Sequence, residues 1–195
     1  MDPLWTNIFH KKLDEESLAY FLKHLPIFSE LSPRSLSTLE GIVHVRNYKA
    51  NETVFEENDP GSGMYMIRSG SVKIYARDQN GAEDELAKLG PGDFFGETTL
   101  TAPAPRTASA KTTENTELVG LFRADILELA ERKPAISSSI FLGLTRVVSE
   151  RLQAAQAKLE QVRSPAYLSD LIGTIGADPL RPARVEQREV QRKVA

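Results

Sequence analysis

The sequence predicts a mainly β fold with flanking helices: an eight-stranded, jelly-roll-like β-roll with N-terminal helices and a long C-terminal helix. Three observations support this fold class. Short segments that alternate apolar and polar residues recur between residues 43 and 123, and glycine recurs at the breaks between them. Strands that recur about every 8–12 residues are typical of rolls and barrels. On both sides of this region apolar residues are instead spaced by three and four, which is the helical period.

Residues 14–41 are predicted to form helices. The first helix has apolar residues at helical spacing, at Leu18, Phe21, Leu22 and Leu25. Pro26 interrupts this helix, because proline has no backbone N–H and its ring clashes with the preceding turn. A second helix follows, with Ser32 as its predicted N-cap and Pro33 at the first helical position.

The central region consists of short segments of β-forming residues with turn residues between them. These segments are HVRNY, NETVFEEND, GMYMIRSGSVKIYARD, ELAKLGPGDFFGE, RTASAKT and TELVGLFR. Because tight turns join neighbouring segments, we expect them to close into one roll.

After Arg123 the helical period returns. One short helix, ADILELAERKP, ends near Pro134, and a long helix runs from Pro134 to Val162. The long helix carries a narrow apolar seam at Phe141, Leu144, Val148, Leu152, Ala155, Leu159 and Val162. We expect its first half to pack on the roll of the same chain. We expect its second half, from Leu152 to Val162, to pair with the same helix of a second copy in a homodimer.

The predicted domain boundaries follow these changes of pattern. An N-terminal helical extension covers residues 1–25, the β-roll with its short helix 26–133, the long helix 134–163 and a tail 164–195. The tail shows no clear core, so a docking segment, a short helix pair and disorder remain alternatives.

Composition narrows the function classes. With 41% hydrophobic and 26% charged residues, the chain has the balance of a globular protein, and its net charge of −3 argues against nucleic acid as the main partner. It has no cysteine and no stretch of about 20 apolar residues, so we expect a cytoplasmic protein without a membrane span. Its three histidines lack metal-ligand spacing, and no catalytic motif is present, so we expect no enzyme, cofactor or metal.

One stretch, FFGETTLTAPAPRTASA (residues 94–110), concentrates residues suited to a ligand. Gly96 permits a sharp turn, and a short helical turn after Glu97 would present free N–H groups to an anion. Arg106 carries a planar donor fork that matches phosphate, and Thr107 adds a hydroxyl. An ionised Glu97 accepts hydrogen bonds only, so beside a phosphate it suits a ribose hydroxyl. The residues alone leave two alternatives, a surface Glu–Arg ion pair and a sugar-phosphate site.

The same residues resemble a known family. GMYMIRSGSVKIY followed by LAKLGPGDFFGETTL and PAPRTASA is similar to the cyclic nucleotide-binding domains of cAMP-dependent kinase regulatory subunits, cyclic-nucleotide-gated channels and bacterial catabolite activators. The resemblance covers about residues 26–160 and is most specific in FGE and PRTA. It implies cAMP or cGMP as ligand and a protein that signals to a partner when nucleotide binds.

The resemblance also implies roles for single residues. Glu97 would bind the ribose 2′-OH and Arg106 the cyclic phosphate, with a further phosphate contact from Thr107. Gly96, Thr98 and Thr99 would offer backbone contacts. Leu100 matches the apolar residue that passes the bound state to the following helices.

The chain departs from the family pattern at three places. Thr98 and Thr99 stand where many members have an aliphatic and a small residue. Asn51 and Asn58 stand where turn glycines are usual, and asparagine is the other residue that best tolerates positive φ. On the long helix Ala155 cannot bond a base through its side chain; Gln156 can, although solvent exposure of Gln156 is the alternative.

Two functions therefore remain open at this stage. One is a cyclic nucleotide sensor, with cAMP as the first choice, that signals to an unknown protein partner. The other is an interaction module of the same fold that binds another ligand, such as cyclic di-GMP, or no nucleotide. The 32 residues after Arg163 are too few for a DNA-binding domain of about 50 residues, so we expect no DNA partner.

Overall fold

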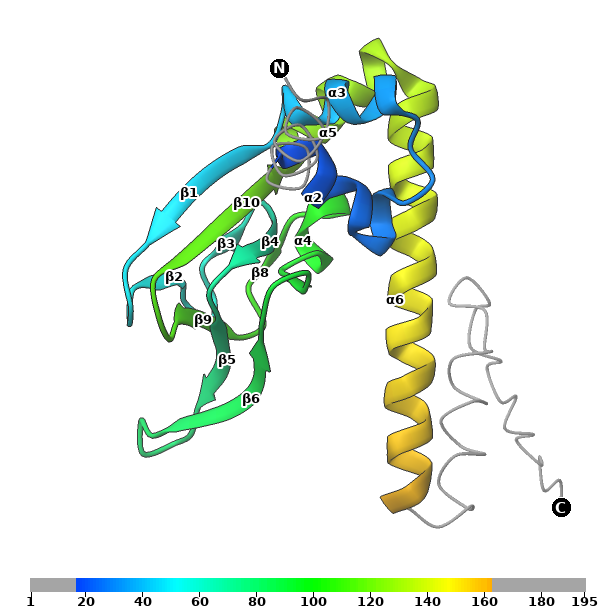
Figure 1. Cartoon of the computed structure of the whole chain (residues 1–195). Coiled ribbons are helices and arrows are strands. Elements are labelled where there is room, and N and C mark those ends of the chain that lie inside the picture. The colour runs from blue at the N-terminus through cyan, green and yellow to red at the C-terminus, as the bar shows by residue number, and fades with distance from the viewer. Residues whose placement is uncertain (1–16, 163–195) are drawn as a thin grey trace, which may run out of the picture. The chain divides into compact units, whose positions relative to one another are not determined.

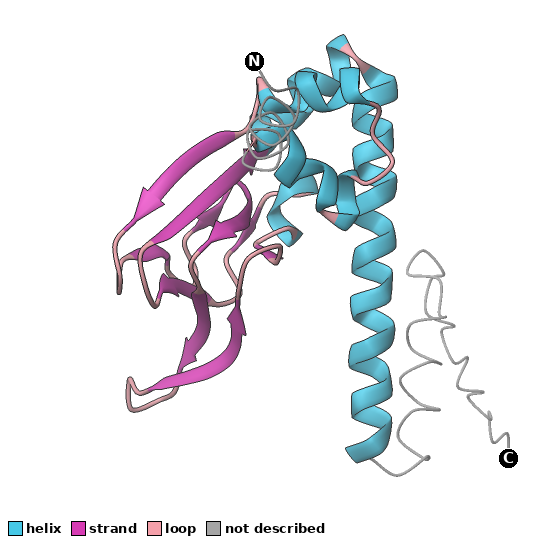
Figure 2. Ribbon diagram, viewed as in Figure 1, coloured by secondary structure: helices cyan, strands magenta, loops and turns pink. Residues whose placement is uncertain are grey.

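A computed structural model describes residues 17–162 and confirms the mainly β fold with flanking helices and a long C-terminal helix (Figures 1 and 2). Of the predicted N-terminal extension, residues 1–16 lie outside the described part, as does the whole predicted tail, 164–195. The chain divides into two compact units between Val148 and Ser149, and each is described by itself.

The described residues contain ten strands rather than eight, and they form two four-stranded antiparallel sheets and one two-stranded pair. One sheet has the order β1-β10-β4-β7: His44–Tyr48, Thr116–Phe122, Gly63–Ser69 and Phe94–Phe95. The other has the order β2-β9-β5-β6: Thr53–Phe55, Ser109–Thr112, Val72–Arg77 and Glu83–Leu89. The pair joins β3, Pro60–Gly61, to β8, Ala104–Pro105.

The β3–β8 pair was not predicted because its residues have the composition of turns. Proline cannot donate to a ladder, and such residues are confined to edges and short pairings. The pairing nevertheless matters for the site, because it brings the loop before β4 beside the loop before Arg106. Two backbone hydrogen bonds extend it, from Arg106 N to Asp59 O and from Asn58 N to Arg106 O, each 2.9 Å long.

The predicted turn chemistry is confirmed at both asparagines. Asn51 and Asn58 have φ angles of 63° and 69°, the left-handed region that glycine usually occupies. Asparagine therefore occupies both left-handed turn positions in this chain.

The helices begin and end close to the predicted residues. They are α2 (Leu18–His24), the 3-10 helix η1 (Pro26–Phe28), α3 (Pro33–Glu40), α4 (Thr98–Thr101), α5 (Arg123–Arg132) and α6 (Pro134–Val162). Ser32 caps α3, since its hydroxyl accepts a hydrogen bond from Ser35 N at 3.2 Å. Helix α5 ends at Arg132, and Pro134 is the first residue of α6, as the sequence predicts.

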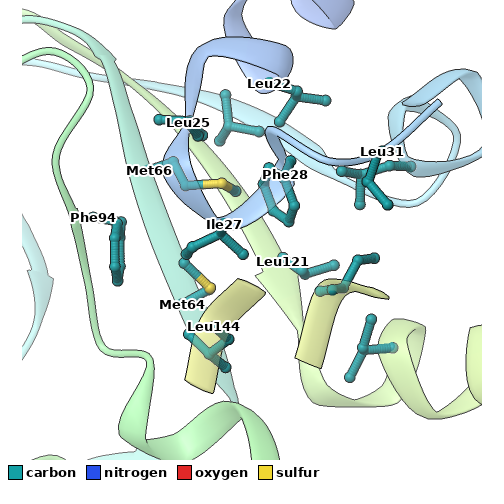
Figure 3. Packing of buried hydrophobic residues seen from close by; sticks show 14 of the residues in the cluster. Leu22, Leu25, Ile27, Phe28, Leu31, Met64, Met66, Phe94, Leu121 and Leu144 are labelled. Carbon is teal, nitrogen blue, oxygen red and sulfur yellow. The ribbon is translucent and has the colours of Figure 1, made fainter. Parts of the chain in front are cut away.

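Successive side chains of β4 point to opposite faces of the sheet, so this strand contributes to two hydrophobic cores. Met64 and Met66 point to the helical side, where they join apolar residues of α2, η1, α3, α5 and α6 in the larger core. Figure 3 shows these methionines with Ile27 and Phe28 of η1, Leu121 of β10 and Leu144 of α6. Ile67 joins the second core, inside the roll. The first half of α6 thus packs on its own chain, as predicted.

Candidate functional site

The stretch that the sequence singled out connects β7 to β9. Gly96 follows β7 with φ of 76°, so the chain turns sharply there in a conformation that glycine adopts without strain. The short helix α4 follows Glu97 directly, as predicted. The chain then runs through β8 and returns to Arg106.

A cavity of about 140 Å³ lies against this stretch. Five of the predicted site residues line it together: Gly96, Glu97, Thr98, Arg106 and Thr107. The remaining walls are Phe55, Ile74, Phe95 and Ala108. Apolar walls with a few convergent polar groups are typical of small-molecule sites.

One nitrogen of the Arg106 guanidinium, Nη1, holds the group in place through its hydrogen bonds. The residue is only 5% exposed. Its Nη1 donates to Gly63 O at 2.8 Å, to Gly96 O at 3.1 Å and to Thr99 Oγ1 at 3.0 Å. Its hydrogen bonds therefore go to backbone carbonyls and a hydroxyl rather than to Glu97, so the structure gives no support to a simple Glu–Arg ion pair.

The Nε side of the Arg106 guanidinium has a different environment. Arg106 Nε is buried and has no hydrogen-bond partner among the described residues. Buried polar groups are nearly always hydrogen-bonded, and leaving a charged group's donor unpaired is costly. Because Nε and Nη2 form the edge that binds oxyanions in bidentate fashion, this edge is suited to a phosphate at the cavity.

The surroundings of Arg106 keep it charged and place an aromatic ring beside it. Its Cζ lies 4.1 Å from the centroid of the Phe55 ring, a cation–π contact. Burial lowers the pKa of Arg106 from its ordinary value, while Tyr65, Asp59 and Glu97 oppose that shift. A guanidinium starts so far above neutral pH that it remains protonated.

Three predicted residues lie elsewhere. The side chain of Thr99 is 1% exposed and binds Arg106, so its role extends beyond the predicted backbone contact, which stays a prediction. Leu100 is 1% exposed and belongs to the larger core together with Ile126 and Ile140, in line with a relay to α5 and α6 that also stays a prediction. Gln156 is an exposed residue of the second unit, and its contact with a base stays a prediction.

Sequence reasoning missed Phe55, Gly63 and Asp59. The sequence predicts Phe55 only as a strand residue and Gly63 only as a turn residue. In the structure the Phe55 ring makes a cation–π contact with Arg106, Gly63 O accepts the shortest side-chain hydrogen bond of Arg106, and Asp59 O accepts from Arg106 N. Phe55 and Gly63 lie 51 and 43 positions from Arg106 in the chain (106 − 55 and 106 − 63). No local pattern signals such contacts; only the closed roll produces them.

The comparisons with known proteins agree with this geometry. Residues 45–133 match the family model of the cyclic nucleotide-binding domain. Residues 45–133 belong to the cyclic nucleotide-binding domain family. A second model, the PPi-PEPCK C-terminal domain, matches residues 137–184, about a quarter of the chain, of which residues 163–184 lie outside the described part.

Relatives within the cyclic nucleotide-binding domain family include regulators of two kinds. The chain is similar to the cyclic AMP receptor protein of Thermus thermophilus, at 34% identity over 71% of this chain and 62% of that protein. It is also similar to a cAMP-dependent protein kinase regulatory subunit of Colletotrichum orbiculare, at 31% identity over 52% of this chain and 25% of that protein. The crystal structure of Thermus thermophilus catabolite activator protein superposes with a TM-score of 0.62 and 34% identity, covering 70% of this chain and 62% of that one.

The match with the cyclic nucleotide-binding regulators is partial in length. The chain covers 62% of the Thermus protein and less of the kinase subunit, so the activities of those whole proteins do not transfer by similarity. Within residues 17–162, no helix has the length and apolar character to cross a membrane.

Proposed function

We propose that this protein is a cyclic nucleotide sensor, with cAMP as its ligand, that changes conformation on binding and signals to a protein partner. The observation that carries the proposal is the buried Arg106, whose Nη1 is fully hydrogen-bonded while its Nε has no hydrogen-bond partner within residues 17–162. A cyclic phosphate supplies the oxygens that this edge requires. In this proposal the protein is a regulator rather than an enzyme; its relatives' names describe a receptor protein and a regulatory subunit.

The other lining residues suit the rest of the nucleotide. Glu97 is half-buried in the same cavity, where its carboxylate can accept a hydrogen bond from the ribose 2′-OH. Thr107 offers a hydroxyl on the same side as Arg106, and Gly96 and Thr98 offer backbone N–H groups. Leu100 would pass the change to α5 and α6, since ligand can shift the protein only by binding two arrangements unequally.

Calorimetric titration tests the proposal directly. We expect cAMP to bind at micromolar concentration or tighter, and Arg106→Ala to weaken it by about 30-fold to 1,000-fold, since losing the partner of a buried charge costs roughly 2–4 kcal/mol. Arg77→Ala is the matched control, because it removes the same charge from an exposed residue paired with Glu56 at 3.6 Å. Absence of heat with both cAMP and cGMP would refute the sensor, and binding of cyclic di-GMP instead would favour the alternative module.

We also propose a homodimer through the second half of α6. Leu152 and Leu159 in this half are 58% and 51% exposed, and Val148, one turn before it, is 41% exposed. Large apolar side chains in a row on one helix are a typical pairing seam.

Replacing Leu152 with glutamate is expected to convert the dimer into a monomer, because two buried carboxylates would face each other in the seam. Light scattering should then report half the wild-type mass. Gln153→Glu adds the same charge beside the seam and should leave the mass unchanged. A wild-type monomer, or a dimer that survives Leu152→Glu, would contradict the proposed seam.

A further inference from the structure

We infer that Thr99 is a positioning residue for Arg106: its buried hydroxyl holds one nitrogen of the guanidinium so that the opposite edge faces the ligand cavity. The inference rests on the proposed function for its consequence in nucleotide binding. Its structural content, the orientation of Arg106 before any ligand arrives, can be tested without nucleotide.

The hydrogen bonds around Thr99 have a defined direction. A guanidinium only donates, so Thr99 Oγ1 accepts from Arg106 Nη1 across 3.0 Å. The single proton of the hydroxyl is then donated to a carbonyl, either Gly96 O at 3.1 Å or Gly63 O at 3.3 Å. Thr99 thus joins Arg106 either to the turn at Gly96, which lines the cavity, or to the start of β4 at Gly63.

These contacts exhaust the donors of Nη1. The nitrogen has two protons, and three acceptors lie within 3.1 Å of it: Gly63 O, Gly96 O and Thr99 Oγ1. The Phe55 ring, whose centroid lies 4.1 Å from Cζ, packs against the same group and limits its movement. Because the guanidinium is planar and rigid, the bonds of Nη1 and the ring against Cζ together restrict where Nε and Nη2 point.

The side chain of Thr99 is itself held in one orientation. A Cβ at Gly61 would lie 2.3 Å from Thr99 Cγ2 and 2.6 Å from Thr99 Cβ, so the methyl side of Thr99 packs directly on the backbone of β3. A β-branched side chain has few χ1 alternatives. With its methyl against Gly61, the hydroxyl of Thr99 remains directed at Arg106.

Two substitutions separate the hydroxyl from the shape. Thr99→Val keeps the size and branching but removes the hydroxyl, whereas Thr99→Ser keeps the hydroxyl. We expect Thr99→Val to weaken cAMP binding about tenfold, the effect of one hydrogen bond to a charged group. Thr99→Ser should stay within about threefold of wild type. In the Arg106→Ala background, Thr99→Val should cause no further loss, because the group it positions is gone.

The ligand-free readout is the Nε–H resonance of Arg106 in a ¹H–¹⁵N spectrum of the full chain, assigned by its loss in Arg106→Ala. In wild type and Thr99→Ser we expect one sharp signal with slow water exchange. In Thr99→Val we expect it to broaden and to exchange faster. Should the valine variant fail to fold by circular dichroism, Thr99→Ala replaces it with the same expectations.

The outcomes distinguish the two proposals. If no nucleotide binds wild type but the Nε–H signal changes in Thr99→Val and not in Thr99→Ser, the sensor function falls and the positioning role stands. If cAMP binds but neither its affinity nor the Nε–H signal changes in Thr99→Val, the positioning role is overturned. The role is equally overturned if Thr99→Val weakens binding as much without Arg106 as with it.

Discussion

Replacing Gly96 with alanine is expected to weaken cAMP binding at least about thirtyfold while the protein stays folded. A Cβ at this position would lie 2.5 Å from Arg106 Nη1, the nitrogen that anchors the guanidinium, and 3.3 Å from Gly63 O. The guanidinium is the far end of a flexible side chain and can move aside, so the clash need not unfold the protein, although it breaks the hydrogen bonds of a buried charge. Once displaced, however, Arg106 loses its anchoring bonds and its edge no longer faces the cavity, which removes roughly 2 kcal/mol of binding.

The sequence offers a matched control for this effect. Gly92 has φ of 88°, close to the 76° of Gly96, so alanine suffers similar backbone strain at both positions. A Cβ at Gly92 would meet no atom within 4 Å. Gly92→Ala should therefore lower the melting temperature through backbone strain alone, by no more than Gly96→Ala does, and should bind cAMP like wild type. Equal cAMP affinities for the two variants in calorimetry would show that the contact with Arg106 has no part in binding.

The fold was predictable because its determinants are local. Each of three signals specifies an element within a few residues and agrees with the structure: the apolar–polar alternation along β4, the Ser32 cap of α3 and the proline that begins α6. The left-handed turns at Asn51 and Asn58 were also predictable, because tolerance of positive φ depends on the single residue at that position. Agreement between local signals and the global fold is expected of a sequence that folds to one structure.

The site was predictable only in part, for a physical reason. Glu97 and Arg106 are close in the sequence, on the connection from β7 to β9, and both line one cavity. What holds Arg106 there comes from distant strands: Phe55 of β2, and Gly63 of β4 through its carbonyl. A backbone carbonyl has no sequence signature, so the anchoring of Arg106 becomes visible only when the roll has closed.

Thr99 shows how a departure from a family pattern acquires meaning. From sequence it was a threonine where a small residue is usual, and its predicted contribution was a backbone contact. In the structure its methyl packs against Gly61 and its hydroxyl binds Arg106, so both extra groups of the side chain have a partner.

The second large effect is on stability, at Gly143 in α6. Gly143→Ala is expected to lower the free energy of unfolding by roughly 2–3 kcal/mol, because overpacking a close contact forces the backbone to shift. A Cβ there would lie 2.1 Å from Ile27 O and 2.9 Å from Ile27 C, both backbone atoms of η1 that cannot turn away. Helix α6 would have to move off η1, loosening a core that contains Phe28 and Leu144.

The direction of the stability change in Gly143→Ala makes the test decisive. By helix propensity alone, glycine to alanine within a helix stabilises by about 0.8–1.0 kcal/mol, so the two mechanisms predict opposite shifts in a urea titration. Ser138→Ala, at an exposed position of the same helix, reports propensity without the contact and should leave stability equal or slightly higher. A Gly143→Ala protein as stable as wild type or more so would mean that α6 does not approach η1 this closely. Destabilisation would instead identify Gly143 as the residue that lets α6 lie against the backbone of Ile27, the contact through which movement of α6 would reach the N-terminal helices.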